Sequence, residues 1–263
     1  MVYHYNGTLY IVVKKGVIYL NNEIKNNRMG TPMKIINHRK NSDIDVEFLD
    51  DFHYIKRHQT YANFKSGSIK NPYDKTICGV GYIGVGEYNT GTKNKHTEEY
   101  QNWVCMLRRC YDNKLKNKYP AYYDSCIVCD EWHDFQTFSK WYNENIYKVN
   151  NERMHIDKDI ICRNSRIYSP ETCLIVPQRI NMLFVEKRKY SDLPTGVKRT
   201  KSGKYTSTYN GRHLGTFDLI EDAAIAHDIE KKKTITEIAY DYKDKIPEKL
   251  YNALINWKTE YIK

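Results

Sequence analysis

The chain has 263 residues, with 42 lysines and arginines against 32 aspartates and glutamates, and a formal net charge of +10. This balance favours a polyanionic partner, because neutralising phosphates releases condensed counterions, and nucleic acid is the first candidate. No run approaches the roughly 18 apolar residues of a membrane span. Lys14, Lys15 and Gly16 interrupt the N-terminal segment before a signal-like core forms. We therefore expect a soluble, cytoplasmic protein with no membrane contact and no obligate protein partner.

The seven cysteines are an odd number in a chain without a secretory signal, so a disulfide framework is not expected. Cys126 and Cys129 have the spacing of a zinc knuckle, and Cys162 and Cys173 could complete four thiolates around a structural Zn²⁺. The alternative is that the four are buried thiols, which behave as small apolar side chains.

Residues 1–75 are expected to form a β-rich accessory module. Thr8–Val13 and Val17–Leu20 flank a turn at Lys15-Gly16, which predicts a hairpin, and Ile44–Leu49 alternates like a half-buried strand. Residues 76–96 are glycine-rich. They lack the Lys-Ser/Thr pair of a phosphate-binding loop, so a turn-rich connection is predicted.

Two amphipathic helices are predicted next. From Thr97, apolar side chains recur at helical spacing, with Arg108 and Arg109 on the other side, where they could meet phosphate. The apolar positions of this helix are Tyr100, Trp103, Val104, Leu107 and Cys110. Residues 130–142 carry a second stripe, formed by Trp132, Phe135, Phe138 and Trp141. We expect both helices to buttress the segment that follows.

Residues 154–184 hold polar side chains in a pattern that favours metal chemistry. His155, Asp157 and Asp159 alternate with apolar residues and Lys158, so in a strand they share one face. After a turn-prone stretch, Cys173–Val176 predicts a second strand. Pro177 suits the first position of a helix, which we expect to run from Gln178 to about Lys187. A helix packed across this hairpin would bring Asn181 over the face that carries His155.

Carboxylate and amide oxygens suit Mg²⁺ or Mn²⁺, and a neutral histidine suits a general base acting on water. The segment resembles the ββα-metal core of the HNH nucleases, in the His-Asn-Asn variant found among phage homing endonucleases. This resemblance implies that His155 is the general base and Asn181 a metal ligand, with Thr172 at the position of the central asparagine.

The match departs from the family at Met154, where a metal-binding aspartate usually precedes the histidine. Asp157 or Asp159 could supply that carboxylate from the same face. In an alternative register, Asp157 takes the aspartate position and Lys158 the position of the base. Both registers keep Asn181.

Residues 191–263 predict a small sheet followed by helices. Gly203 and Asn210-Gly211 mark turns between three short strands, and a helix starts near Leu219 with Asp218 as its N-cap. Lys231–Lys233 is interpreted as a charge run at the end of this helix, and residues 247–261 as a closing helix. A sheet with a basic face can enter the DNA major groove.

This region resembles the apetala-type, or ethylene-response-factor, DNA-binding domain. The landmarks are Gly196-Val197-Lys198, Gly203-Lys204-Tyr205, Leu214-Gly215-Thr216-Phe217 and the helical run Asp222–Asp228. The resemblance implies that a set of side chains from the sheet faces double-stranded DNA. These are Lys198, Arg199, Lys204, Tyr205 and Arg212.

Together these patterns predict an α+β protein in four parts. Residues 1–75 form the β-rich module, 76–96 the connection, 97–190 a ββα-metal nuclease core with its helices, and 191–263 the apetala-type domain with its closing helix. The expected function is a DNA endonuclease, in the cytoplasm of a bacterial host if the gene is of phage origin. The alternative is a non-catalytic DNA-binding regulator derived from a nuclease, which Met154 and Thr172 favour. A third interpretation, an RNA-binding protein, rests on charge and the 24 tyrosines.

Overall fold

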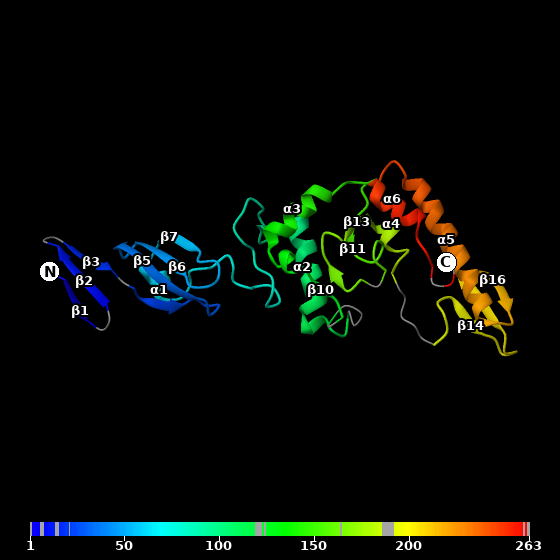
Figure 1. Ribbon diagram of the computed structural model, residues 1–263, viewed down its shortest axis with the longest axis horizontal. Helices are drawn as coiled ribbons and strands as arrows, with labels where there is room; N and C mark the ends of the chain where they lie inside the picture. Colours follow the sequence, from blue (N-terminus) through cyan, green and yellow to red (C-terminus); the bar gives the residue numbers. More distant parts are fainter. Residues whose placement is uncertain are drawn as a thin grey trace. The chain divides into compact units, whose positions relative to one another are not determined.

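The computed structural model (Figure 1) describes residues 2–5, 8–13, 16–20, 22–118, 123, 125–163, 165–185, 192–259 and 261. Helices and strands are mixed along these residues, in agreement with the expected α+β class. The chain divides into two compact units, one formed by residues 1–118 and 130–140 and the other by residues 119–129 and 141–263. This division does not follow the four expected parts, whose boundaries remain predictions. None of the helices in these ranges is long and apolar enough to cross a membrane.

The first unit begins with an antiparallel sheet of three strands, β1 (Val2–Tyr5), β2 (Thr8–Val13) and β3 (Gly16–Leu20). Val13 pairs with Gly16 across the second turn. The expected hairpin is therefore confirmed, but Gly16 belongs to β3 and not to the turn. Residues 14–15, which connect the two strands, lie outside the described residues.

A second antiparallel sheet follows, in the order β4 (Ile24–Asn26), β5 (Pro32–Lys40), β6 (Asp43–Phe48) and β7 (Ile55–Gln59). The alternation expected for the strand at Ile44 is confirmed, because Ile44, Val46 and Phe48 are all buried. They pack with residues of β5 and with Phe64 of the short helix α1 (Tyr61–Lys65). This core holds the β-rich module together.

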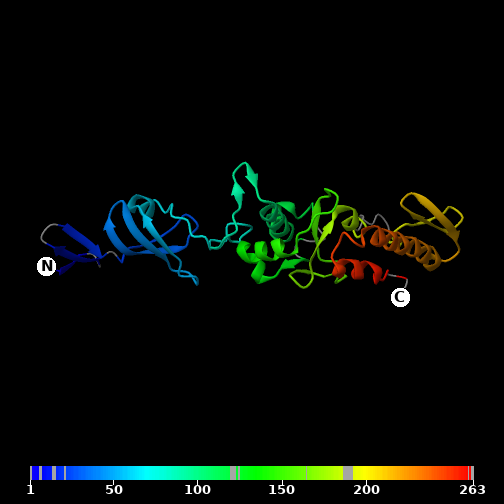
Figure 2. The same ribbon diagram turned by 90° about the horizontal axis from the view of Figure 1, so that it is seen from above.

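Residues 76–96 are rich in turns, as predicted, and their longest regular piece is the short hairpin of β8 (Gly91–Thr92) and β9 (Lys95–His96). Figure 2 shows this hairpin standing out from the neighbouring helices. Gly81 packs against the next helix. A side-chain carbon at this position would lie 2.5 Å from Leu107 and 3.0 Å from Trp103, so the close approach requires glycine.

The first predicted helix is confirmed as α2 (Glu98–Tyr111), which starts at Thr97, whose hydroxyl accepts from the Tyr100 N–H. A 3₁₀ turn, η1 (Asn113–Leu115), follows it. The second predicted helix is divided into a 3₁₀ turn, η2 (Asp130–His133), and α3 (Phe135–Asn145). The division arises because the Asp134 carboxylate accepts from the Gln136 N–H at 3.0 Å and begins a new helix.

The aromatic stripes of these helices form a core, as predicted. Trp103, Trp132, Phe135 and Phe138 have no exposed surface, and the Trp103 indole N–H donates to the Trp132 carbonyl at 2.7 Å. Arg108 forms an ion pair with Asp112 at 3.1 Å, on the exposed side of α2.

The second unit contains the remaining elements. They are β10 (Ile127–Val128), β11 (Met154–Asp157), β12 (Ile167–Tyr168), β13 (Leu174–Pro177), α4 (Gln178–Asn181), β14 (Val197–Arg199), β15 (Tyr205–Tyr209), β16 (Arg212–Phe217), α5 (Ile220–Tyr242) and α6 (Glu248–Ile255). One buried cluster joins β13, α4, α5 and α6, and includes Val176, Ile180, Ile235 and Leu250. The 154–177 hairpin therefore shares its core with the C-terminal helices.

Three details of the C-terminal helices differ from the predictions. Leu219, and not Asp218, is the N-cap of α5, and the Asp218 carboxylate pairs instead with Lys204 at 2.9 Å. Figures 1 and 2 show α5 as one continuous helix, so Lys231–Lys233 lie within it and not at its end. Lys232 reaches the end of α6, where its ammonium donates to the Ile255 carbonyl at 2.6 Å. The closing helix is also shorter than expected and ends at Ile255.

Candidate active site and nucleic-acid interface

The hairpin that carries His155 forms as predicted. β11 and β13 are antiparallel, with His155 opposite Val176 and Asp157 opposite Leu174. Residues directly opposite each other project from the same face of a two-stranded sheet. His155 and Asp157 therefore share one face with Val176, and both are partly buried there. Ile156 projects from the other face and is buried.

The short helix α4 covers the face of the hairpin that carries His155. α4 contacts both β11 and β13, and Ile180, which has no exposed surface, packs in the same cluster as Val176. Since Val176 lies on the His155 face, α4 lies over that face. Asn181 is the last residue of α4 and is partly buried. His155 and Asn181 thus belong to one strand–strand–helix unit.

Asp157 combines a structural contact with an environment that suits a cation. Its Oδ1 accepts from the backbone N–H groups of Asp159 at 2.9 Å and Ile160 at 2.8 Å. Burial raises the pKa of the Asp157 carboxyl above its ordinary value, although these two backbone hydrogen bonds act in the opposite direction. A cation beside this carboxyl would favour the charged form that burial disfavours.

Asp159 does not continue the alternation that the sequence suggested. β11 ends at Asp157, so Asp159 lies in the turn that follows, where its carboxylate pairs with the Lys158 ammonium at 2.8 Å. The expected shared face of His155, Asp157 and Asp159 is therefore wrong for Asp159. The same ion pair bears on the alternative register, because it already engages the Lys158 ammonium that would stand at the position of the base.

Two further details of this segment differ from the expected pattern. α4 ends at Asn181, well before Lys187, and a turn with Leu183 N–H donating to the Ile180 carbonyl follows it. Thr172 supports the loop before β13, since its hydroxyl donates to the Ile167 carbonyl at 2.7 Å and accepts from the Ser169 N–H at 3.1 Å.

The four cysteines proposed for zinc come from either side of β10, from the loop after β11 and from the residue before β13. Cys126 and Cys129 flank β10, which pairs in parallel with β12, while Cys162 is exposed. Within the part of the chain that the structure describes, no three of these thiols lie within ligand distance of one another. Burial raises the pKa of the Cys173 thiol to about 12, which disfavours the thiolate that zinc needs. The geometry does not support the expected zinc site.

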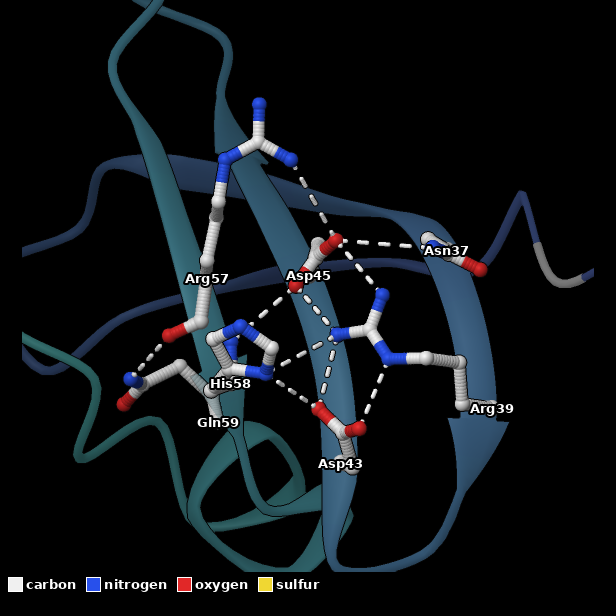
Figure 3. A network of polar contacts seen from close by, with 7 residues as sticks. All are labelled: Asn37, Arg39, Asp43, Asp45, Arg57, His58 and Gln59. Carbon is white, nitrogen blue, oxygen red and sulfur yellow. Dashed lines mark hydrogen bonds and ion pairs between the residues drawn. The ribbon is translucent and has the colours of Figure 1, made fainter.

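A different polar cluster lies on the β5–β7 sheet (Figure 3). Asp43, Asp45 and His58 bring their ligand atoms within 4.8 Å of one another, and they are the one such group of His, Cys, Asp or Glu found among the described residues. The Arg39 guanidinium already lies between the carboxylates, with Nη2 at 2.7 Å from Asp43 and 2.6 Å from Asp45. Its hydrogen bonds hold the pKa of both carboxyls well below the usual range.

This cluster is an ion-pair network and not a vacant metal site, because the arginine supplies the positive charge. Figure 3 shows that its members come from three neighbouring strands, and the Asp45 carboxylate also accepts from the His58 backbone N–H at 3.0 Å. The sequence did not predict this network. Asp43 and Asp45 alternate as residues on one face of a strand do, but nothing in the sequence pairs them with Arg39.

The C-terminal sheet has one face on α5 and one face turned away from it. Val197, Ser207 and Gly215 lie opposite one another, and Val197 packs on Ala223 and Ala224 of α5. The next positions along the strands, Lys198, Thr206 and Thr216, also lie opposite one another. They form the face away from α5, which we call the outer face.

The register does not gather the five expected DNA contacts on one surface. Lys198 lies on the outer face, and Lys204 precedes β15 and pairs with Asp218. Tyr205 lies opposite Arg199 and Phe217 and packs on the α5 side, so Arg199 points to that side as well. Arg212 pairs with Glu230 of α5 at 3.2 Å. Tyr205, Arg199 and Arg212 therefore do not share the outer face with Lys198, and their contact with DNA stays a prediction.

Comparison of the chain with known proteins gives no match to a family model, a curated protein or a solved structure.

Proposed function

We propose that the chain is a metal-dependent DNA endonuclease of the HNH type. The observation that supports this most is the position of α4, which covers the face of the β11–β13 hairpin that carries His155 and Asp157. A general base and a partly buried carboxyl from β11 and an amide from α4 then belong to one small module. These are the groups that hydrolysis of a phosphodiester with one hard divalent ion requires.

In the proposed reaction, His155 in its neutral form takes a proton from a water molecule that attacks the phosphorus. Asp157 and Asn181 would hold a Mg²⁺ or Mn²⁺ ion, and Asp159 is the less suitable ligand because Lys158 already pairs with it. When bound, the ion supplies charge stabilisation at the leaving 3′-oxygen. The backbone N–H groups that bind Asp157 Oδ1 fix the orientation of this carboxylate.

DNA binding is assigned in the proposal to the basic C-terminal module, which we propose as an apetala-type domain. The outer face offers Lys198 together with the hydroxyls of Thr206 and Thr216. Phosphate contacts fix orientation and raise affinity without reading the base sequence. In this proposal the β-rich N-terminal part is an accessory module.

The second candidate is a DNA-binding regulator that has lost cleavage. The ion pair between Lys158 and Asp159 favours it, because it removes one of the carboxylates expected beside His155. Met154, at the position where a metal-binding aspartate is expected, also favours it. An RNA-binding function is the third interpretation, and competition between duplex DNA and RNA for the protein tests it.

Plasmid nicking with and without Mg²⁺ separates nuclease from regulator. The proposal expects Mg²⁺-dependent conversion of supercoiled to open-circular plasmid, loss of this activity in His155→Ala, and DNA affinity that stays within a few-fold of wild type. His96→Ala is the matched control, since His96 is exposed and lies outside both candidate sites. Wild-type nicking by His155→Ala would remove His155 from the mechanism, and absence of nicking by the wild-type chain would favour the regulator.

A further inference from the structure

A cavity lies beside the candidate active site, between the segment that follows β11 and the end of α6. Its volume is about 450 Å³, which is within the range of roughly 300–1,000 Å³ that small-molecule sites occupy. The residues that line it include Ile160, Arg163, Asn252, Asn256, Trp257 and Lys258.

The charged side chains of this cavity favour an anion. Arg163 and Lys258 line it and are both exposed, and among the described residues that line it there is no aspartate or glutamate. A phosphate group attracts both a guanidinium and an ammonium. The cavity therefore has one end that suits a phosphate.

Trp257 gives the cavity a planar aromatic surface. The edge of Phe184 meets this indole at a centroid distance of 4.6 Å and an angle of 64°, which restrains the ring. The Arg163 guanidinium lies over the indole ring, with its carbon 5.9 Å from the ring centroid. Aromatic rings and arginine planes are the surfaces on which unstacked nucleobases pack.

Two amides and an apolar side chain complete the lining. The Asn256 side-chain amide donates to the Asn252 backbone carbonyl at 2.9 Å, which holds Asn256 at the end of α6. Asparagine side chains offer both a donor and an acceptor, as the edges of nucleobases do. Ile160 is the apolar side chain among them.

The cavity is tied directly to the hairpin. Ile160 lines the cavity, and its backbone N–H donates to Asp157 Oδ1 at 2.8 Å; Asp157 ends β11 two residues after His155. A strand whose phosphate lies at His155 would therefore pass close to this cavity.

We propose that this cavity binds one unstacked nucleotide of the DNA strand that the hairpin acts on. The base lies against Trp257 with its edge toward Asn252 and Asn256, and its phosphate lies between Arg163 and Lys258. This inference rests on the proposed nuclease function for the identity of the strand. The binding site itself needs neither the metal nor cleavage.

The test uses the full chain and thymidine 5′-monophosphate, with inorganic phosphate as the comparison. Binding is followed through the indole N–H signal of Trp257, one of four tryptophans, assigned with Trp257→Phe. The nucleotide should shift this signal and bind more tightly than phosphate. Because a stacked base contributes about 1–3 kcal/mol, Trp257→Ala should weaken nucleotide binding about 5–150-fold without weakening phosphate binding. The affinity of this variant is followed through the ³¹P signal of the probe.

Charge reversals keep the test decisive if Trp257→Ala disturbs the packing on Phe184. Arg163→Glu and Lys258→Glu change exposed side chains, and each should weaken binding of both probes. Lys249→Glu, at an exposed position of α6 that does not line the cavity, should leave both unchanged. Equal affinity of all variants, or of nucleotide and phosphate in the wild-type chain, would overturn the inference.

Nicking measured on the same variants separates the two proposals. A chain that nicks plasmid but whose cavity variants bind the nucleotide like the wild type refutes the cavity site alone. A chain that binds the nucleotide as expected but never nicks refutes the nuclease and leaves a nucleotide site without its proposed strand.

Discussion

The packing of Ile180 offers a direct perturbation of the candidate active site. Ile180 is completely buried between the β11–β13 hairpin and the C-terminal helices. Replacing it with alanine removes three buried carbons, at about 0.8 kcal/mol each, and leaves a cavity, so the expected loss of stability is about 2–5 kcal/mol. α4 has four residues and no side-chain N-cap bond, and therefore has little stability of its own. The loss of this packing should detach α4 from the face of the hairpin that carries His155.

Thermal unfolding and plasmid nicking measure the two consequences. For a unit of this size, 2–5 kcal/mol corresponds to a fall in Tm of about 4–20 °C. Nicking by Ile180→Ala should fall with the displacement of Asn181, while DNA affinity, which the proposal assigns to the β14–β16 sheet, should change little. Met182→Ala, two residues along and 60% exposed, is the control and should behave like the wild type. Wild-type nicking by Ile180→Ala at a reduced Tm would refute the role given to α4.

Two more outcomes follow from ion pairs and charges. Asp43 and Asp45 have lowered pKa values because Arg39 hydrogen-bonds to them, so their contribution to stability is complete above their ordinary pKa of 3.8 and is lost as the pH falls below it. Arg39→Gln should therefore destabilise the first unit at pH 7 and flatten its acid unfolding curve, and an unchanged curve would contradict the network. On the outer face, Lys198→Ala should weaken DNA binding for all sequences and lower the salt dependence by about one counterion. Arg212→Ala should have a smaller effect, because Arg212 pairs with Glu230, and the reverse order would restore the family-based assignment.

The sequence correctly predicts the elements in which the apolar pattern and the turn residues indicate the same structure. The α2 stripe predicts a buried face, and Trp103 and Leu107 are buried. Asn210-Gly211 predicts a tight hairpin, and both residues have the positive φ that such a turn needs. The strand–loop–strand–helix order after Met154 is also correct.

The failures arise where a side chain or a bulge changes the local pattern. Asp157 binds the two N–H groups that follow it and ends β11, so the alternation that included Asp159 stops. In the C-terminal sheet the register shifts between Ser207 and Thr208, where Ser207 lies opposite Gly215 and Thr208 opposite His213. Such a shift reverses which residues face α5, and no pattern in the sequence predicts it.

Long-range packing explains the other differences. α5 continues through Lys231–Lys233 because Ile235, Ala239 and Tyr242 beyond them are buried in the shared core. The network of Arg39 with Asp43 and Asp45 depends on the pairing of β5 with β6, which composition and spacing do not specify.

In the proposed nuclease, His155 and Asn181 lie beside the same divalent ion. Mn²⁺ titration of the full chain, followed by broadening of the His155 ring signals and the Asn181 side-chain amide signals, tests it without requiring cleavage. We expect both sets of signals to broaden together at low Mn²⁺, before the signals of the exposed His53, and to remain sharp in Asp157→Asn. Broadening of one set without the other, or of neither, would contradict the proposed site.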